Sequence, residues 1–278
     1  MRRMIGFMCE GHLLTGTLDE APGDIGLLIV SGGNEIRCGA HGGQAQLAAQ
    51  VAALGHPVLR YDRRGIGDSE GSNSGFMDSR ADIAAAIAAF RREAPALDRI
   101  IAFGNCDAAS ALALFHDGQL DGLILANPWV IEEEQQDDGE AADTPTKPSA
   151  AAIRARYWDR IKNPRSLIDL FTGKIDLKKL VGGLMKAAKK DQPTGLAIQI
   201  AAQFSQSDVP VHLLIAKRDT TAMAFMGAWN SDVFNAARGK ENIRLSATDS
   251  TSHSFASDAD KKLLLSKILE EIGSEGGT

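Results

Sequence analysis

The chain has 278 residues, of which 44% are hydrophobic and 24% charged, and its net charge is −6. This composition supports a buried core, excludes a disordered or collagen-like chain, and disfavours a dedicated nucleic-acid-binding protein. No apolar run approaches the roughly 18 residues of a membrane span, and the apolar stretch 5–8 is too short for a signal peptide, so we expect a cytoplasmic globular protein.

The first 126 residues alternate between predicted strands and predicted helices. Residues 5–9 and 13–18 flank the turn signal Glu10-Gly11, which predicts an antiparallel hairpin. Short apolar runs predict buried strands, and stretches with helical spacing separate them. The strands are predicted at 26–30, 57–61, 99–103 and 122–126, and the helices at 44–54, 79–92 and 108–116. This alternation predicts a parallel α/β sheet.

The rhythm breaks between residues 127 and 207 and then resumes. An acidic segment, 132–143, and a Pro/Thr-rich segment, 144–148, predict an exposed loop. Helical stretches follow at 150–161, 166–171 and 177–188, whose excess of Lys and Arg we interpret as a solvated face rather than a surface for an anionic partner. The later elements are strands 211–216 and 243–247 and helices 222–234 and 261–272. We therefore expect a core of residues 1–127 and 208–278, with a helical cap insertion at 128–207.

Cys106 is the strongest candidate nucleophile. The strand 99–103 runs into Gly104-Asn105-Cys106-Asp107-Ala108, and a helix follows at once. A nucleophile elbow requires small residues two positions before and after the nucleophile, and Gly104 and Ala108 meet that requirement. The helix N-terminus favours a thiolate at Cys106. The alternative is a buried structural cysteine; Cys9 and Cys38 complete a set of three that shows neither a disulfide framework nor a CxxC zinc motif.

The one literal G-x-S-x-G match lies elsewhere, at Gly67-Asp68-Ser69-Glu70-Gly71. It comes several residues after its strand, and no helix follows it directly, so the elbow context is missing. We interpret Ser69 as part of a loop rather than as a nucleophile.

A nucleophile needs a base and an orienting acid. His253 lies in a polar loop before the last helix, and Asp219 directly follows the strand 211–216, with Asp249 as the alternative acid. His41 could line the site or belong to a turn. The order Cys106, Asp219, His253 is the nucleophile–acid–histidine order of α/β-hydrolases. Three further histidines are predicted to be structural: His56, His116 and His212.

An oxyanion hole requires two backbone N–H groups near the nucleophile. We expect one from Asp107, the residue after Cys106, and the other from Gly33 in the loop after the first parallel strand. Asn34, beside Gly33, is a candidate substrate-binding residue. Trp129, at the junction with the cap, could wall the acyl pocket or belong to the core.

Several segments resemble known families. Residues 62–69 (DRRGIGDS) look like the D-x-R-G-x-G-x-S segment of α/β-hydrolases. Residues 106–110 (CDAAS), 127–129 (NPW) and 218–222 (RDTTA) resemble the exosortase A system-associated hydrolase 1 family, and residues 37–41 (RCGAH) are similar to that family's segment after the first oxyanion turn. The likeness extends from about residue 26 to residue 253 and is weakest in the insertion.

The resemblance implies an α/β-hydrolase fold with a helical cap, Cys106 as nucleophile, Asp219 as acid and His253 as base. It also implies a bacterial protein encoded beside exopolysaccharide and protein-sorting systems. The chain departs from the family at Asn105, where a bulkier apolar residue is usual, and at residues 33–35, where Gly-Pro-Gln is usual. Both departures lie near the predicted oxyanion hole, where they bear on substrate preference.

These residues predict a hydrolase that cleaves a small-molecule carboxylic ester or thioester through a covalent acyl-enzyme, with no metal or organic cofactor and no nucleic-acid partner. Two alternatives stay open at this point. One is a non-catalytic binding module of an exopolysaccharide or protein-sorting system, since fold does not imply function. The other is an acyltransferase, which passes the acyl group to an alcohol or amine instead of water.

Overall fold

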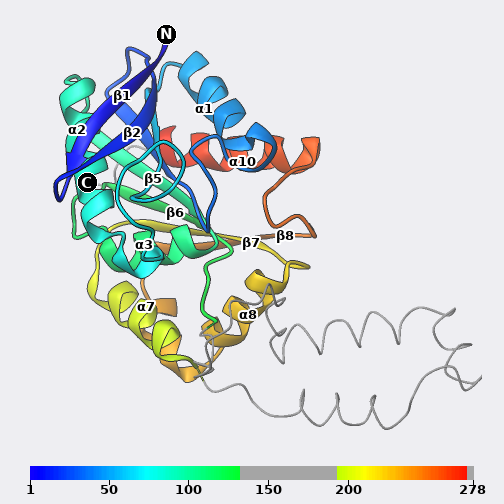
Figure 1. Ribbon diagram of the computed structural model, residues 1–278. Helices are drawn as coiled ribbons and strands as arrows, with labels where there is room; N and C mark the ends of the chain where they lie inside the picture. Colours follow the sequence, from blue (N-terminus) through cyan, green and yellow to red (C-terminus); the bar gives the residue numbers. More distant parts are fainter. Residues whose placement is uncertain (132–192, 274–278) are drawn as a thin grey trace, which may run out of the picture.

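The computed structural model describes residues 1–131 and 193–273. They form an eight-stranded sheet of order β1-β2-β4-β3-β5-β6-β7-β8 (Figure 1). β1 (Arg2–Cys9) and β2 (His12–Asp19) make the predicted hairpin, and β2 also pairs antiparallel with β4. The remaining pairings in the sheet are parallel, as the sequence predicts. The other strands are β3 (Ile25–Val30), β4 (Val58–Tyr61), β5 (Arg99–Asn105), β6 (Gly122–Ala126), β7 (Val211–Ala216) and β8 (Ile243–Thr248).

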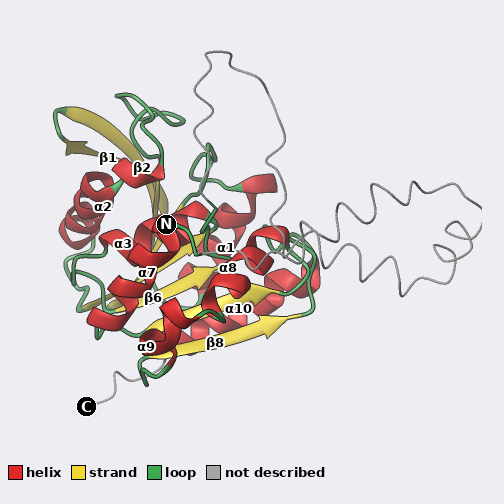
Figure 2. Ribbon diagram, turned by 90° about the horizontal axis from the view of Figure 1, so that it is seen from below, coloured by secondary structure: helices red, strands yellow, loops and turns green. Residues whose placement is uncertain are grey.

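Helices cover both faces of the sheet (Figure 2). Side chains alternate along a strand, so Leu27 and Ile29 of β3 join one hydrophobic cluster while Leu28 and Val30 join the other. The first cluster is closed by α1 (Gly43–Ala53) and α10 (Asp258–Gly273). The second is closed by α2 (Arg80–Glu93), α3 (Asp107–Phe115), α7 (Gly195–Gln206), α8 (Thr220–Trp229) and the short α9 (Asn235–Arg238).

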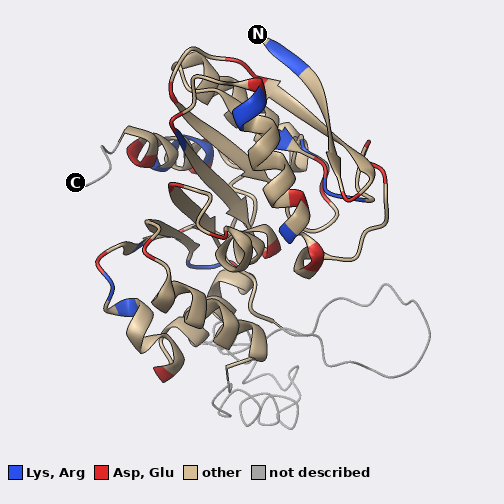
Figure 3. Cartoon of the chain, turned by 90° about the vertical axis from the view of Figure 1, so that its left-hand side faces the viewer, with Lys and Arg blue, Asp and Glu red and all other residues tan. Residues whose placement is uncertain are grey.

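Burial on both faces explains the composition of the central strands. β3, β6 and β7 contain no Lys, Arg, Asp or Glu, and nearly all of their residues are buried. In Figure 3 the charged residues fall mostly on loops and on the outer helices, away from the middle of the sheet. A parallel sheet that is covered on both sides requires such continuous apolar strands.

Two predicted helix boundaries are wrong. The predicted helix 222–234 ends at Trp229, and a separate turn of 3-10 helix covers Asp232–Phe234. The break occurs at Ser231, whose backbone is extended and whose hydroxyl donates to the carbonyl of Ala228 at 2.6 Å. The last helix begins at Asp258 rather than 261, because the Ser257 hydroxyl accepts the backbone N–H of Asp260 at 3.1 Å, as an N-cap does.

The predicted cap is described only at its two ends. α7 lies within the predicted insertion 128–207 and buries Ala197, Ile200 and Phe204 in the core. The predicted loop 132–148 and the predicted helices at 150–161, 166–171 and 177–188 lie outside the described residues, so the domain boundaries stay a prediction. None of the described helices is long and apolar enough to cross a membrane.

Candidate active site

Cys106 occupies a strained turn between β5 and α3. Its φ is 62° and its ψ is −126°, a backbone conformation that is unfavourable for a residue with a side chain and that is typical of functional turns. A Cβ at Gly104 would lie 2.8 Å from the backbone carbon of Ala108. The turn therefore requires glycine two residues before Cys106, as an elbow does.

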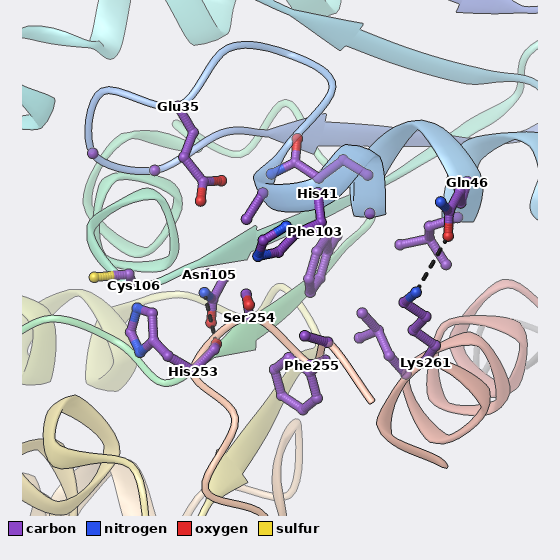
Figure 4. Close-up of a pocket in the computed structure, with 18 of the residues that line it drawn as sticks. Glu35, His41, Gln46, Phe103, Asn105, Cys106, His253, Ser254, Phe255 and Lys261 are labelled. Atoms are coloured by element: carbon purple, nitrogen blue, oxygen red, sulfur yellow. Dashed lines mark hydrogen bonds between the residues drawn. The ribbon is translucent and has the colours of Figure 1, made fainter. Parts of the chain in front are cut away.

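His253 and Asp219 come to this turn from two other loops. Figure 4 shows the His253 ring beside Cys106. His253 follows β8, and its Nδ1 lies 3.0 Å from Oδ2 of Asp219, which follows β7. The second oxygen of Asp219 accepts the backbone N–H of Ala222 at 2.9 Å and caps α8. Cys106 and His253 line the same cavity, and Cys106 is among the groups that raise the pKa of His253. The structure thus brings the three candidate catalytic side chains together at one place.

These contacts determine the charges of His253 and Asp219. The hydrogen bond with Asp219, followed by the interaction with the Cys106 side chain, raises the pKa of His253 to about 10. Burial alone would raise the pKa of Asp219, but hydrogen bonds from His253 and from the backbone of Ala222 and Thr221 outweigh it and hold that pKa below its usual value. The site therefore favours a protonated imidazole beside an ionised Asp219.

Two asparagines hold the histidine loop in place. Asn105 donates its amide to the carbonyl of His253 at 3.1 Å. Asn127 donates to the Asn105 side chain at 3.2 Å and accepts the backbone N–H of Ala216 at 2.8 Å. In the sequence, Asn105 stands out only as a departure from a family, and Asn127 has no predicted role. The available signal was a polar residue at the carboxyl end of two neighbouring parallel strands, where functional loops gather.

The two predicted oxyanion-hole residues are adjacent, and one predicted donor is already bonded. The N–H of Gly33 donates to a carboxylate oxygen of Asp107 at 2.7 Å. The carbonyl of Gly33 accepts a hydrogen bond from the guanidinium of Arg63, which fixes the orientation of this turn. A Cβ at Gly32 would lie 2.5 Å from the same Asp107 oxygen, so the loop approaches α3 closely. The Gly33 amide therefore already binds one anionic oxygen, that of the Asp107 carboxylate.

The Ser69 hydroxyl stabilises its loop through two hydrogen bonds. Its hydroxyl donates to the carbonyl of Asp62 at 2.7 Å and accepts the backbone N–H of Thr15 at 2.9 Å. Asp62 is fully buried and binds both the backbone and the side chain of Arg37. The segment 62–69 therefore ties the loops after β3 and β4 together.

The other candidate residues are occupied elsewhere. Burial, followed by a hydrogen bond to Asp82, raises the pKa of Cys9 to about 12, so this thiol stays protonated and unreactive. Asp249, the alternative acid, pairs with Arg218 on the surface. Three histidines have structural partners: His56 contacts the carbonyl of Ile25, His116 accepts the N–H of Gly118, and His212 binds Glu271 and Ser246.

A cavity of about 260 Å³ opens beside Cys106 and His253 and extends between α1 and α10. His41 lines it, which favours a place in the site over a role in the turn alone. Asn34 and Trp129 are not among its lining residues in the described part of the chain. Asn34 accepts a hydrogen bond from Asn73 at 2.8 Å, and Trp129 packs against the core. Substrate binding by these two residues stays a prediction.

The sheet, the elbow after β5 and the order Cys106, Asp219, His253 define an α/β-hydrolase. The sequence model of the family described as "Serine aminopeptidase, S33" (Hydrolase_4) matches residues 27–260, and the chain belongs to this family. A search of curated proteins found no match.

Several solved structures share the fold. The chain is similar to the esterase Pf2001 of Pyrococcus furiosus, with 15% identity, a TM-score of 0.66, and coverage of 100% of this chain and 94% of that one. It is also similar to the α/β-hydrolase GrgF of Penicillium sp. sh18, with 16% identity, a TM-score of 0.64 and 98% coverage of both chains. A third similar structure is the thioesterase domain of the curacin biosynthetic pathway, with 15% identity, a TM-score of 0.55, and coverage of 97% and 99%.

The family description names serine, whereas the residue at the elbow of this chain is Cys106. Two serines, Ser69 and Ser110, are held by hydrogen bonds to backbone groups. Ser69 has both of its hydrogen-bonding functions satisfied by backbone groups, and Ser110 is fully buried in α3 and donates to the carbonyl of Trp129 at 2.6 Å.

Proposed function

We propose that the protein hydrolyses a carboxylic ester or thioester, with Cys106 as the nucleophile, His253 as the acid–base group and Asp219 as the residue that orients the ring. The observation that carries this proposal is the hydrogen bond between Asp219 and His253 at a cavity that His253 shares with Cys106 of the elbow. The similar solved structures, described as esterases and a thioesterase, support the reaction class.

In the acylation step, the Cys106 thiolate attacks the substrate carbonyl carbon and forms a tetrahedral intermediate. The N–H groups of Asp107 and Gly33 stabilise the oxyanion, once the Asp107 side chain has left the Gly33 amide. The intermediate collapses as the bond to the leaving group breaks, and the His253 imidazolium donates its proton to the departing alcohol or thiol. The acyl group is then held on sulfur as a thioester.

In the deacylation step, neutral His253 takes a proton from water as the water oxygen attacks the thioester carbonyl. Collapse of the second intermediate releases the carboxylic acid and returns the sulfur as a thiolate beside the imidazolium. Asp219 keeps Nδ1 of the ring bonded throughout, so Nε2 carries the proton in both steps. The cycle consumes one ester bond and one water molecule.

The test is turnover of a panel of short- to medium-chain 4-nitrophenyl esters and acyl thioesters by the full chain. We expect Cys106→Ala to abolish turnover and Ser69→Ala to retain it, provided that both variants keep the wild-type circular dichroism spectrum. Retention of full activity by Cys106→Ala would overturn the assignment of the nucleophile. If the wild type turns over no substrate and forms no acyl adduct in the intact mass, the result contradicts hydrolysis of these esters and thioesters and favours a binding module or a substrate outside the panel.

The relationship to a narrower family is also part of this proposal. The segments 106–110, 127–129 and 218–222 support membership in the exosortase A system-associated hydrolase 1 family, and with it a bacterial cytoplasmic enzyme. Asn105, where that family usually has a bulkier apolar residue, bonds to the His253 carbonyl. This departure therefore affects the position of the base.

A further inference from the structure

The cavity beside Cys106 carries opposite charges at its two ends. Figure 4 shows Glu35 above Cys106 at one end, and Lys261 together with Gln46 at the other. Resting on the function proposed above, we propose that the acyl group of the substrate is short and ends in an anionic group, such as a carboxylate, that binds the ammonium of Lys261.

Lys261 is available to such a group. It is partly buried on the first turn of α10, and its ammonium contacts the side-chain oxygen of Gln46 at 3.4 Å. Among the described residues, no carboxylate lies within ion-pair distance of it. The acids on the same turn point elsewhere or are exposed: Asp260 binds the Ser257 hydroxyl, and Asp258 is exposed. An ammonium group with one long, exposed hydrogen bond and no carboxylate partner among the described residues can bind an anionic ligand.

The surface between the two ends suits a hydrocarbon chain. Phe103 and Leu47 form part of it, and both are more than nine-tenths buried. Phe255 and Leu264 continue it toward α10 and are equally buried. Methylene groups lying on these side chains would be removed from water, while the carboxylate would reach the cation at the end. An acyl group that ends in a methyl would place an apolar atom against the ammonium and lose that contact.

The size of the cavity limits the length of the chain. Its volume of about 260 Å³ lies just below the range of roughly 300–1,000 Å³ that is usual for small-molecule sites. Phe255 and Leu264 close it on the side of α10. The expected acyl donors are therefore half-esters or half-thioesters of short dicarboxylic acids rather than long fatty acyl groups.

The test compares 4-nitrophenyl half-esters of four- to eight-carbon dicarboxylic acids with the neutral alkanoates of the same length, after subtraction of the enzyme-free rate. We expect the wild type to have the higher kcat/KM for the half-esters. Lys261→Met should reduce the ratio of anionic to neutral kcat/KM by about tenfold, mainly through KM, because a hydrogen bond to a charged group is lost. The matched control is Lys262→Met, which removes an exposed charge one residue away and should leave the ratio unchanged.

A ratio that is equal in the wild type and Lys261→Met, or that falls equally in Lys262→Met, would overturn the proposal. Calorimetry on Cys106→Ala with the monomethyl ester of adipic acid separates this proposal from that of hydrolysis. Binding that is lost in the Cys106→Ala/Lys261→Met double variant supports the anion site even where the wild type hydrolyses no ester. Equal binding by the single and double variants overturns the anion site even where hydrolysis by Cys106 is established.

Discussion

Removal of the Asp107 side chain should make the enzyme faster on neutral esters. In the structure the carboxylate of Asp107 accepts the N–H of Gly33 at 2.7 Å, and the proposed mechanism needs that N–H for the substrate oxyanion. A substrate carbonyl must therefore displace the carboxylate before it can be attacked. The side chain acts as an internal competitor for the oxyanion hole, whereas the backbone N–H of Asp107 remains a donor in any variant.

The magnitude follows from the strength of that bond. A hydrogen bond to a charged group contributes about 1.5–3 kcal/mol, and about 1.36 kcal/mol corresponds to a factor of ten in rate. Because Asp107 is only partly buried, we expect the lower end, an increase in kcat/KM of about tenfold for Asp107→Ala. Asp107→Asn should increase kcat/KM less, because its amide oxygen is a neutral and weaker acceptor. Loss of an acid in the first turn of α3 should cost about 0.3–1 kcal/mol of stability.

The assay is kcat/KM for 4-nitrophenyl acetate, with Glu35→Ala as the matched control. That variant removes a carboxylate that lines the cavity without removing the acceptor of the Gly33 N–H. An increase in Asp107→Ala that exceeds the effect of Glu35→Ala supports displacement of the carboxylate. If Asp107→Ala is folded and its kcat/KM equals or falls below that of the wild type, the reasoning is wrong.

Three further predictions follow from the same geometry. Gly104→Ala should lower both the melting temperature and the activity, because its Cβ would lie 2.8 Å from the backbone of Ala108. The control Gly239→Ala, whose Cβ would have its nearest contact at 3.6 Å, should change neither. Equal melting temperatures of the two variants would contradict this prediction. The raised pKa of His253, about 10, means that its contribution to the free energy of unfolding is fully present below pH 6.5 and is lost as pH rises to about 10. In urea titrations, the stability difference between the wild type and His253→Asn should shrink across that interval, and a constant difference would refute the assignment. Phe255→Ala should join the cavity beside Cys106 to the neighbouring cavity of about 320 Å³ and shift the substrate preference to longer acyl chains. The substitution should lower the free energy of unfolding by about 3–5 kcal/mol. An unchanged chain-length profile would show that Phe255 does not separate the two cavities.

The fold and the outline of the site could be predicted because their signals are local. Gly104 and Ala108 around Cys106 predict an elbow from steric demands alone, and the continuous apolar runs of β3, β6 and β7 predict strands buried on both faces. Polar residues that directly follow strands, such as Asp219, can be placed at the carboxyl edge of the sheet without knowledge of their contacts.

The features of the site that could not be predicted depend on contacts between segments far apart in the sequence. Asn105 and His253 are 148 residues apart, and the bond between them follows only from the order of the strands. The same holds for the bond between Gly33 and Asp107, which lie 74 residues apart. Lys261 gave no sequence signal, because a lysine on the first turn of a helix is ordinary until the helix is packed beside a cavity. The helix end at Trp229 was missed because Ser231 breaks the helix through its own hydrogen bond.

The most direct test of the central claim is to trap the acyl-enzyme. The wild type would be mixed with a 4-nitrophenyl ester, quenched in acid within the first turnover, digested and mapped by mass spectrometry. The account predicts that the acyl mass is found on the peptide that contains Cys106 and is absent from the same peptide of Cys106→Ala. An acyl group on the peptide that contains Ser69, or on that of Cys38, would contradict Cys106 as the nucleophile.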